Sequence, residues 1–262
     1  MKLASISLAF LTFFSFVAAT FGQKPNKFPD AIQRSEDAAR IIAILATLPD
    51  SGFPKELVDK AEAIGVFPKV TRETMGFTHF TQGYGVISAR QGDAWTMPAF
   101  YQFGGGGYGN PFAKAESNGV ILLFMTKDAV SWFEKGGVAL KNEKKAVGGP
   151  VGIVTKTIEK EIEGAQILAY AYYNGKLSGT TFGKSFWKSF NLDPDNKINK
   201  PLYGLKGREV LAGASVDPAK VPAGIPAFHE ALEKYYGRGA MSLVISHPVF
   251  VRHSNYRNSR SY

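Results

Sequence analysis

Apolar residues recur at three- and four-residue spacing between residues 30 and 48, and this pattern predicts an amphipathic helix. Asp30 is a residue type that caps helix starts, and Pro49 marks the end of the segment. A second helix is predicted over residues 54–63, where a proline in the first turn precedes mixed charged and apolar positions. The two segments together predict a helical hairpin ahead of the rest of the chain.

Beyond residue 64, short runs of β-branched and aromatic residues are separated by glycine-containing turns, which is typical of strands. Strands are predicted over residues 64–68, 84–89, 94–103, 120–125 and 151–156, with a short helix at 127–133. Two more strands, 167–173 and 176–182, flank an Asn-Gly pair that readily adopts the positive φ angles of a type I′ turn. This strand-rich region predicts a sheet of mainly antiparallel strands.

Three other segments complete the predicted architecture. The consecutive glycines 104–107 are expected to form a turn between two strands, and residues 191–208 a polar loop with at most one short turn of helix. Residues 226–236 are predicted to form a closing helix. We therefore expect a single α+β domain with an N-terminal helical hairpin, a curled, mainly antiparallel sheet and a closing C-terminal helix.

The first residues carry the features of an export signal. Residues 1–22 combine one lysine, a long apolar run and small residues near Ala19, and this order is typical of a secretory signal peptide cleaved near Ala19 or Gly22. The alternative is a membrane anchor, for which the apolar run is short and lacks flanking positive charge. We expect an exported protein, periplasmic or extracellular and peripheral to the cell envelope. Its domain is expected over residues 23–238, and the basic residues 239–262 are expected to form a disordered tail.

Composition limits the available chemistry. The 262 residues include no cysteine, which excludes disulfides, thiol nucleophiles and cysteine-bound metals. The net charge of +9 is concentrated in residues 176–210 and at the C-terminal end rather than spread over the chain. A nucleic-acid-binding protein is usually basic across its recognition element, so we expect no nucleic-acid partner.

Several patterns approach catalytic or nucleotide-binding motifs but lack their spacing. The Gly-Lys-Ser sequence at residues 183–185 has neither the first glycine nor the following long helix of a phosphate-binding loop. The glutamates within residues 159–163 alternate along a segment expected to be exposed. We predict no enzymatic activity, no metal and no cofactor. The hydrolase alternative requires His79 or His229 beside a serine and an acid in a cleft.

Cations and aromatic residues occur together in two places, a combination suited to anionic lipid, where rings enter the headgroup region and cations meet phosphate. The predicted binding residues are Lys24, Lys27, Arg34 and Arg40 as phosphate contacts, Phe28 and Ile32 as inserting residues, and Lys184, Trp187 and Lys188 as a second patch. We expect reversible binding to anionic membrane lipid. In the alternative, the apolar stripe of the first helix packs on the sheet, the lysines keep the loop soluble, and the protein is a structural or protein-binding module.

Several short glycine- and aromatic-containing motifs follow one another between residues 34 and 213. They are Pro54-Lys55-Glu56-Leu57, Ile64-Gly65-Val66-Phe67-Pro68, Gly83-Tyr84-Gly85-Val86, Trp95-Thr96-Met97-Pro98-Ala99-Phe100, Gly148-Gly149-Pro150-Val151-Gly152, the stretch from Ile167 to Gly179, and Tyr203-Gly204. Their order resembles the SYLF-domain family, also called the YAB domain, and in particular its exported bacterial members. The resemblance implies a non-enzymatic module that binds phosphoinositides or other acidic phospholipids. Eukaryotic members bind or bundle actin, a partner that we do not expect for an exported protein.

The chain departs from the family pattern at three places. Asn118-Gly119 stands where the family has an acidic residue before its buried central strand, and residues 110–113 and 135–147 also differ. The resemblance assigns no particular lipid-contacting residue, so the binding residues named above rest on charge and apolarity alone.

Overall fold

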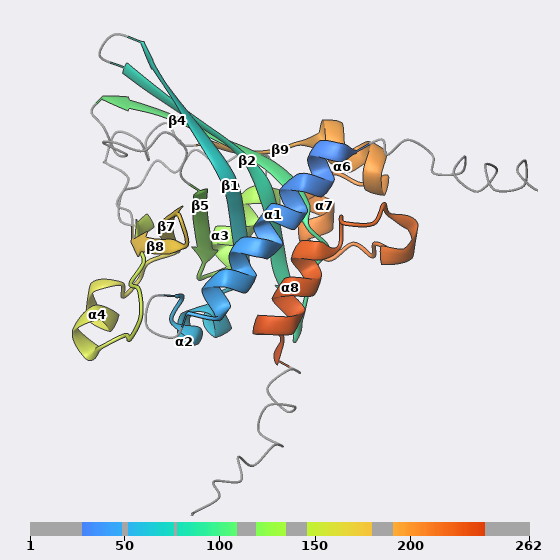
Figure 1. The fold of residues 1–262 in the computed structure, drawn as a ribbon. Helices are drawn as coiled ribbons and strands as arrows, with labels where there is room; N and C mark the ends of the chain where they lie inside the picture. The colour runs from blue at the N-terminus through green and yellow to red at the C-terminus, as the bar shows by residue number, and fades with distance from the viewer. Residues whose placement is uncertain are drawn as a thin grey trace, which may run out of the picture.

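Helix α1 (Pro29–Ala46) crosses one face of a long, curved sheet in the computed structural model, and helix α8 (Ala227–Tyr236) lies beside it (Figure 1). The structure describes residues 28–48, 52–75, 78–108, 119–134, 146–179 and 191–238. The predicted signal peptide and tail lie outside these ranges. Within them, no helix is both long enough and apolar enough to cross a membrane.

The sheet consists mainly of antiparallel strands. They are β1 (Ala63–Met75), β2 (Thr78–Gln91), β3 (Ala94–Trp95), β4 (Ala99–Tyr108), β5 (Gly119–Phe124), β6 (Ala146–Gly148), β7 (Ile167–Tyr173), β8 (Lys176–Gly179) and β9 (Asn191–Pro194). Over the described residues the order is β6-β7-β5-β1-β2-β4-β9, with β3 paired to β2 and β8 paired to β7. The β6–β7 pair is parallel and the other described pairs are antiparallel. The predicted sheet is therefore confirmed.

Helices cover parts of this sheet and its ends. Besides α1 and α8 they are α2 (Lys55–Lys60), α3 (Lys127–Glu134), α4 (Lys156–Glu161), α6 (Asn196–Tyr203) and α7 (Gly207–Leu211), with the 3₁₀ turn η2 (Pro218–Lys220). The arrangement confirms a single α+β domain that opens with α1 and α2 and closes with α8. Helix α2 is shorter than predicted because β1 already begins at Ala63.

The apolar stripe of α1 packs inward. Ala31, Ala38, Ile42 and Leu45 are buried in the core, at the spacing that places them on one side of the helix. The hydroxyl of Ser35, on the same side, donates to Ile225 O at 2.7 Å and accepts from Phe228 N at 3.2 Å. This hydroxyl therefore satisfies a free N–H at the start of α8 and joins the first helix to the last.

The Asn-Gly hairpin and the short helix α3 form as predicted. Asn174 and Gly175 have φ angles of 47° and 78°, as a type I′ turn between β7 and β8 requires. The described part of the second arm ends at Gly179, and residues 180–182 lie outside the described ranges.

Three sequence predictions are wrong. Residues 151–156 form no strand, since β6 lies before them and α4 begins at Lys156, with Thr155 Oγ1 accepting from Ile158 N. The predicted loop at 191–208 contains β9, α6 and the start of α7. The glycines 104–107 lie inside β4, where they pair with β2 rather than forming a turn. The glycines and β9 form strands through pairing with residues distant in sequence, which outweighs the local propensity, whereas α4 has a local cause in its Thr155 cap.

Strands β1 and β2 are much longer than their apolar runs predicted. They pair from Ala63↔Ala89 to Met75↔Thr78, with a register shift between Val66 and Lys69. Together with β4 they extend beyond the helices, toward the upper left of Figure 1. This extension exposes one face of the three strands, which is the surface considered next.

Candidate functional site

Alternate residues of β2 and their partners on β1 and β4 form a solvent-exposed surface beside α1, which we call the ribbon face. It consists of Lys69, Thr71, Phe80, Gln82, Tyr84, Gln102 and Gly104. Lys69 pairs with Tyr84 and Thr71 with Gln82, so these side chains project to the same side of the sheet. The opposite side is closed, since Val70, Thr81 and Phe103 are buried there.

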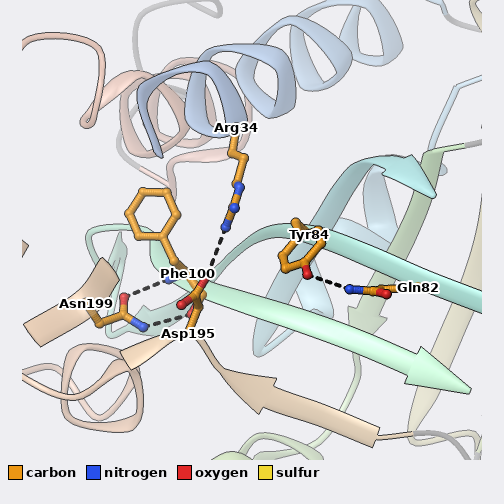
Figure 2. Close-up of polar contacts among 6 residues, drawn as sticks. All are labelled: Arg34, Gln82, Tyr84, Phe100, Asp195 and Asn199. Carbon is orange, nitrogen blue, oxygen red and sulfur yellow. Dashed lines mark hydrogen bonds and ion pairs between the residues drawn. The ribbon is translucent and has the colours of Figure 1, made fainter. Parts of the chain in front are cut away.

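Two aromatic side chains on the ribbon face are exposed to solvent. Phe80 is 54% exposed and Tyr84 is 38% exposed. The two positions are separated by Gln82, whose Nε2 donates to the Tyr84 hydroxyl (Figure 2). Phe80 and Tyr84 are thus the large apolar side chains that the ribbon face exposes to solvent among the described residues.

Glycines beside Phe80 and Gln82 leave these side chains uncovered. In β4, Gly104 is the partner of Gln82 and Gly106 is the partner of Phe80. A Cβ at Gly104 would meet no atom closer than Thr81 O at 3.8 Å, so packing does not require glycine at that position. A shallow cavity of about 470 Å³ lies here, lined by Phe80, Gln82, Gln102 and the glycines together with Asn191 and Asp193 of β9.

A second groove, between α1 and the ribbon face, holds Arg34. It has a volume of about 460 Å³ and is lined by Asp30, Gln33, Arg34, Asp37, Pro68, Lys69, Thr71, Gln82 and Tyr84. The Arg34 guanidinium carbon lies 4.7 Å from the centroid of the Tyr84 ring, and Nη1 donates to Asp195 Oδ2 at 3.1 Å (Figure 2). Both side chains of this ion pair are largely buried, at 19% and 14% exposure. Arg34 thus ties α1 to the end of β9 and holds one face of the Tyr84 ring.

The structure places four of the predicted lipid-binding residues, and each already has contacts within the protein. Phe28 and Ile32 are partly buried and pack against the core, so their inserting role stays a prediction. Arg34 is paired with Asp195, and the exposed Arg40 is paired with Asp37 at 2.8 Å. These side chains do not gather into one outward-facing patch.

The remaining predicted binding residues are not placed. Lys24, Lys27, Lys184, Trp187 and Lys188 lie outside the described residues. Basic and acidic residues nearly balance in the described ranges, so the excess positive charge of the chain belongs to the segments outside them.

Sequence reasoning missed the ribbon face, although a signal was present. Phe80, Gln82 and Tyr84 alternate with Thr81 and Gly83, which is the period of two expected for a strand with one exposed face. Two of the three exposed residues are aromatic, whereas exposed strand positions are more often polar, so the residue types alone do not indicate an exposed face.

The hydrolase alternative depends on His79 or His229 lying beside a serine and an acid. The Nδ1 atom of His229 on α8 is buried without a hydrogen-bond partner, so no described acid orients this ring through Nδ1. The side chain of His79 is not among those that the structure describes. The glutamates 159, 161 and 163 are exposed, as expected. Within the described ranges, no group of three or more histidine, aspartate or glutamate side chains is arranged to hold a metal ion.

Comparison with models of known protein families found no match to this chain, and comparison with curated proteins found none either.

Proposed function

We propose that this protein binds reversibly to anionic phospholipid surfaces through the ribbon face, without catalysing a reaction. The observation that carries the proposal is the exposure of Phe80 and Tyr84 on one face, beside the exposed cation Lys69. Aromatic rings are stable at the level of lipid headgroups, where the ring leaves water while its surroundings remain polar. A lysine beside them can meet a lipid phosphate.

The proposed attachment draws its positive charge mainly from two sequence segments outside the described residues, which join the described chain at Phe28 and Asn191. The leader containing Lys24 and Lys27 joins the described chain at Phe28, at the start of α1, whose next turn lines the Arg34 groove. The segment containing Lys184 and Lys188 joins it at Asn191, which lines the cavity beside Phe80. Each basic residue near an anionic leaflet contributes roughly 1 kcal/mol, so a few give detectable but reversible binding.

The resemblance to the SYLF-domain family fits this proposal, because that family includes binders of acidic phospholipids and phosphoinositides. We propose membership of that family on the order of the motifs alone. With the signal-like N-terminus, the proposed setting is the periplasmic or extracellular side of the envelope, with lipid as the partner and no cofactor.

Vesicle flotation of the purified protein tests the proposal. We expect it to float with vesicles that contain anionic lipid and to remain unbound with pure phosphatidylcholine. Raising the ionic strength should weaken the binding, because screening reduces the attraction between lysine and phosphate. Absence of binding to both vesicle types would reject lipid binding, and the protein-binding alternative would then be preferred.

Replacing Phe80 with alanine should reduce the partition coefficient onto anionic vesicles about tenfold, the equivalent of about 1.4 kcal/mol. The reason is that this ring is the most exposed apolar side chain on the ribbon face. Tyr173→Ala is the matched control, since Tyr173 is 55% exposed but lies at the end of β7, away from the ribbon face. Equal losses in the two variants would show that the ribbon face has no special part in binding.

A further inference from the structure

A separate cavity lies near the end of β2 that is remote from Phe80. Its volume is about 390 Å³, within the usual range for small-molecule sites. Charged and polar residues from four elements or their flanking loops line it, among them Glu62, Arg90, Gln91, Lys127, Ser131 and Arg238. None of these residues was singled out by the sequence, and none belongs to the ribbon face.

Arg90 is the unusual residue of this cavity. Arg90 is only 8% exposed, and its guanidinium carbon lies 4.0 Å from the centroid of the Trp95 ring. Nη2 donates to Tyr236 O at 3.0 Å. Nε and Nη1 are buried without any hydrogen-bond partner among the described residues. Two unpaired N–H groups of a buried cation are costly. Because Arg90 also lines the cavity, an anion bound there would offset its buried positive charge.

Neighbouring carboxylates do not supply this partner. The Glu233 carboxylate accepts from Trp95 N at 2.6 Å instead of forming an ion pair with Arg90. No ion pair links Arg90 to Glu62 or Asp59 in the described chain, although both are near enough to favour its charge. Burial, and secondly the positive charge of Arg238, lower the pKa of Arg90, while the nearby carboxylates of Asp59, Glu233 and Glu62 act in the opposite direction.

We propose that this cavity binds a phosphate group, with Arg90 and Lys127 as its cations, since Arg238, which also lines the cavity, is already paired with Asp93 at 3.5 Å. A tetrahedral oxyanion accepts hydrogen bonds on several sides, which suits cations from two elements, β2 and α3, that line one cavity. The volume of about 390 Å³ leaves room beyond one phosphate group, which favours an organic phosphate over inorganic phosphate. Glu62, which also lines the cavity, disfavours further negative charge.

The ligand can be a soluble phosphate ester or the headgroup of a lipid, and the experiment separates them. The purified protein is titrated with inorganic phosphate, with glycerol 3-phosphate, and with vesicles containing phosphatidic acid, and sodium acetate at matched ionic strength is the anion control. The readouts are calorimetry and the indole Nε1–H signal of Trp95 in NMR spectra. Trp95→Phe assigns that signal among the three tryptophans.

Glycerol 3-phosphate should bind more tightly than phosphate and shift the Trp95 signal, and acetate should do neither. Lys127→Glu should weaken the binding about fivefold or more, because it reverses the charge of a cation that lines the cavity. Lys156→Glu is the matched control, since Lys156 is also an exposed lysine at the first position of a short helix. Arg90→Lys keeps the positive charge but removes the planar guanidinium with its several N–H donors. It should abolish glycerol 3-phosphate binding and the shift of the Trp95 signal, in a variant that circular dichroism shows to be folded.

A response to acetate equal to that of glycerol 3-phosphate, or equal weakening in Lys127→Glu and Lys156→Glu, would overturn the proposal. Failure of both phosphates in solution, together with vesicle binding that Lys127→Glu leaves unchanged, would also overturn it while leaving the ribbon-face proposal intact. Binding of glycerol 3-phosphate without vesicle flotation would support the cavity and reject the lipid-surface function.

Discussion

Replacing Asn199 with alanine should lower the free energy of unfolding by about 3 kcal/mol. Asn199 on α6 is fully buried, and its amide holds both backbone groups of Phe100, accepting from N at 2.9 Å and donating to O at 2.8 Å (Figure 2). This amide continues the hydrogen bonding of β4 where the pairing with β9 ends at Tyr101. Alanine would leave Phe100 N–H buried and unpaired and would also leave a cavity. Urea denaturation followed by circular dichroism measures the change.

Two further substitutions test this reasoning. Asn191→Ala removes an exposed asparagine at the start of β9 and should change stability by no more than about 0.5 kcal/mol. Asn199→Asp keeps the volume but replaces the donor to Phe100 O with a buried carboxylate. It should be at least as damaging as alanine at neutral pH and less so in acid, where the protonated carboxyl regains a donor. A loss in Asn199→Ala no greater than in Asn191→Ala would contradict the role of the amide.

The parts of the fold that sequence could predict are those with a strong local cause. The stripe of α1 has the helical period, and Asn174-Gly175 has the residue types that a type I′ turn requires. The closing helix α8 likewise has a buried stripe of Phe228, Leu232 and Tyr236 at helical spacing. These elements were predicted because their residue types leave few alternatives.

The parts that sequence could not predict depend on distant partners. Gly104 and its neighbours favour a turn locally, yet they belong to the ten-residue strand β4, because β2 pairs with β4 along the length of that strand. Residues 191–194 carry a proline and two polar residues, and become a strand only through pairing with residues 101–104. A residue's hydrogen-bond partner ninety positions away leaves no local signal in a single sequence.

The candidate sites show the same division. Sequence reasoning chose cations by their charge, but Arg34 and Arg40 are both paired with carboxylates, one of them 161 positions away. Arg90, whose Nε and Nη1 find no partner among the described residues, lies in a strand whose sequence resembles core. Whether a charged side chain is free for a ligand depends on its partners in the fold, and its residue type does not reveal them.

The ribbon depends on the packing of Phe67 beneath it. Phe67 is fully buried in β1 next to the register shift, and its ring meets the edge of Phe103 at 4.8 Å between centroids. Glycines make room for it, since a Cβ at Gly85 would lie 2.7 Å from both Cα and Cδ1 of Phe67. A Cβ at Gly83 would lie 2.5 Å from the Phe103 ring. The two rings and the two glycines thus form one packed unit behind the ribbon face.

Replacing Phe67 with alanine should therefore destabilise the protein by about 4 kcal/mol, a large part of the stability of an ordinary domain. Phe80→Ala, a change of the same chemistry on the exposed side of the ribbon, should alter the unfolding free energy by about 0.5 kcal/mol or less. Urea denaturation measures both. Equal losses would contradict the packing described for Phe67. The expected outcome separates two roles of phenylalanine in these strands. Phe80→Ala should weaken the proposed vesicle binding and keep the stability, whereas Phe67→Ala should lower the stability, because Phe67 is buried on the other side of the sheet.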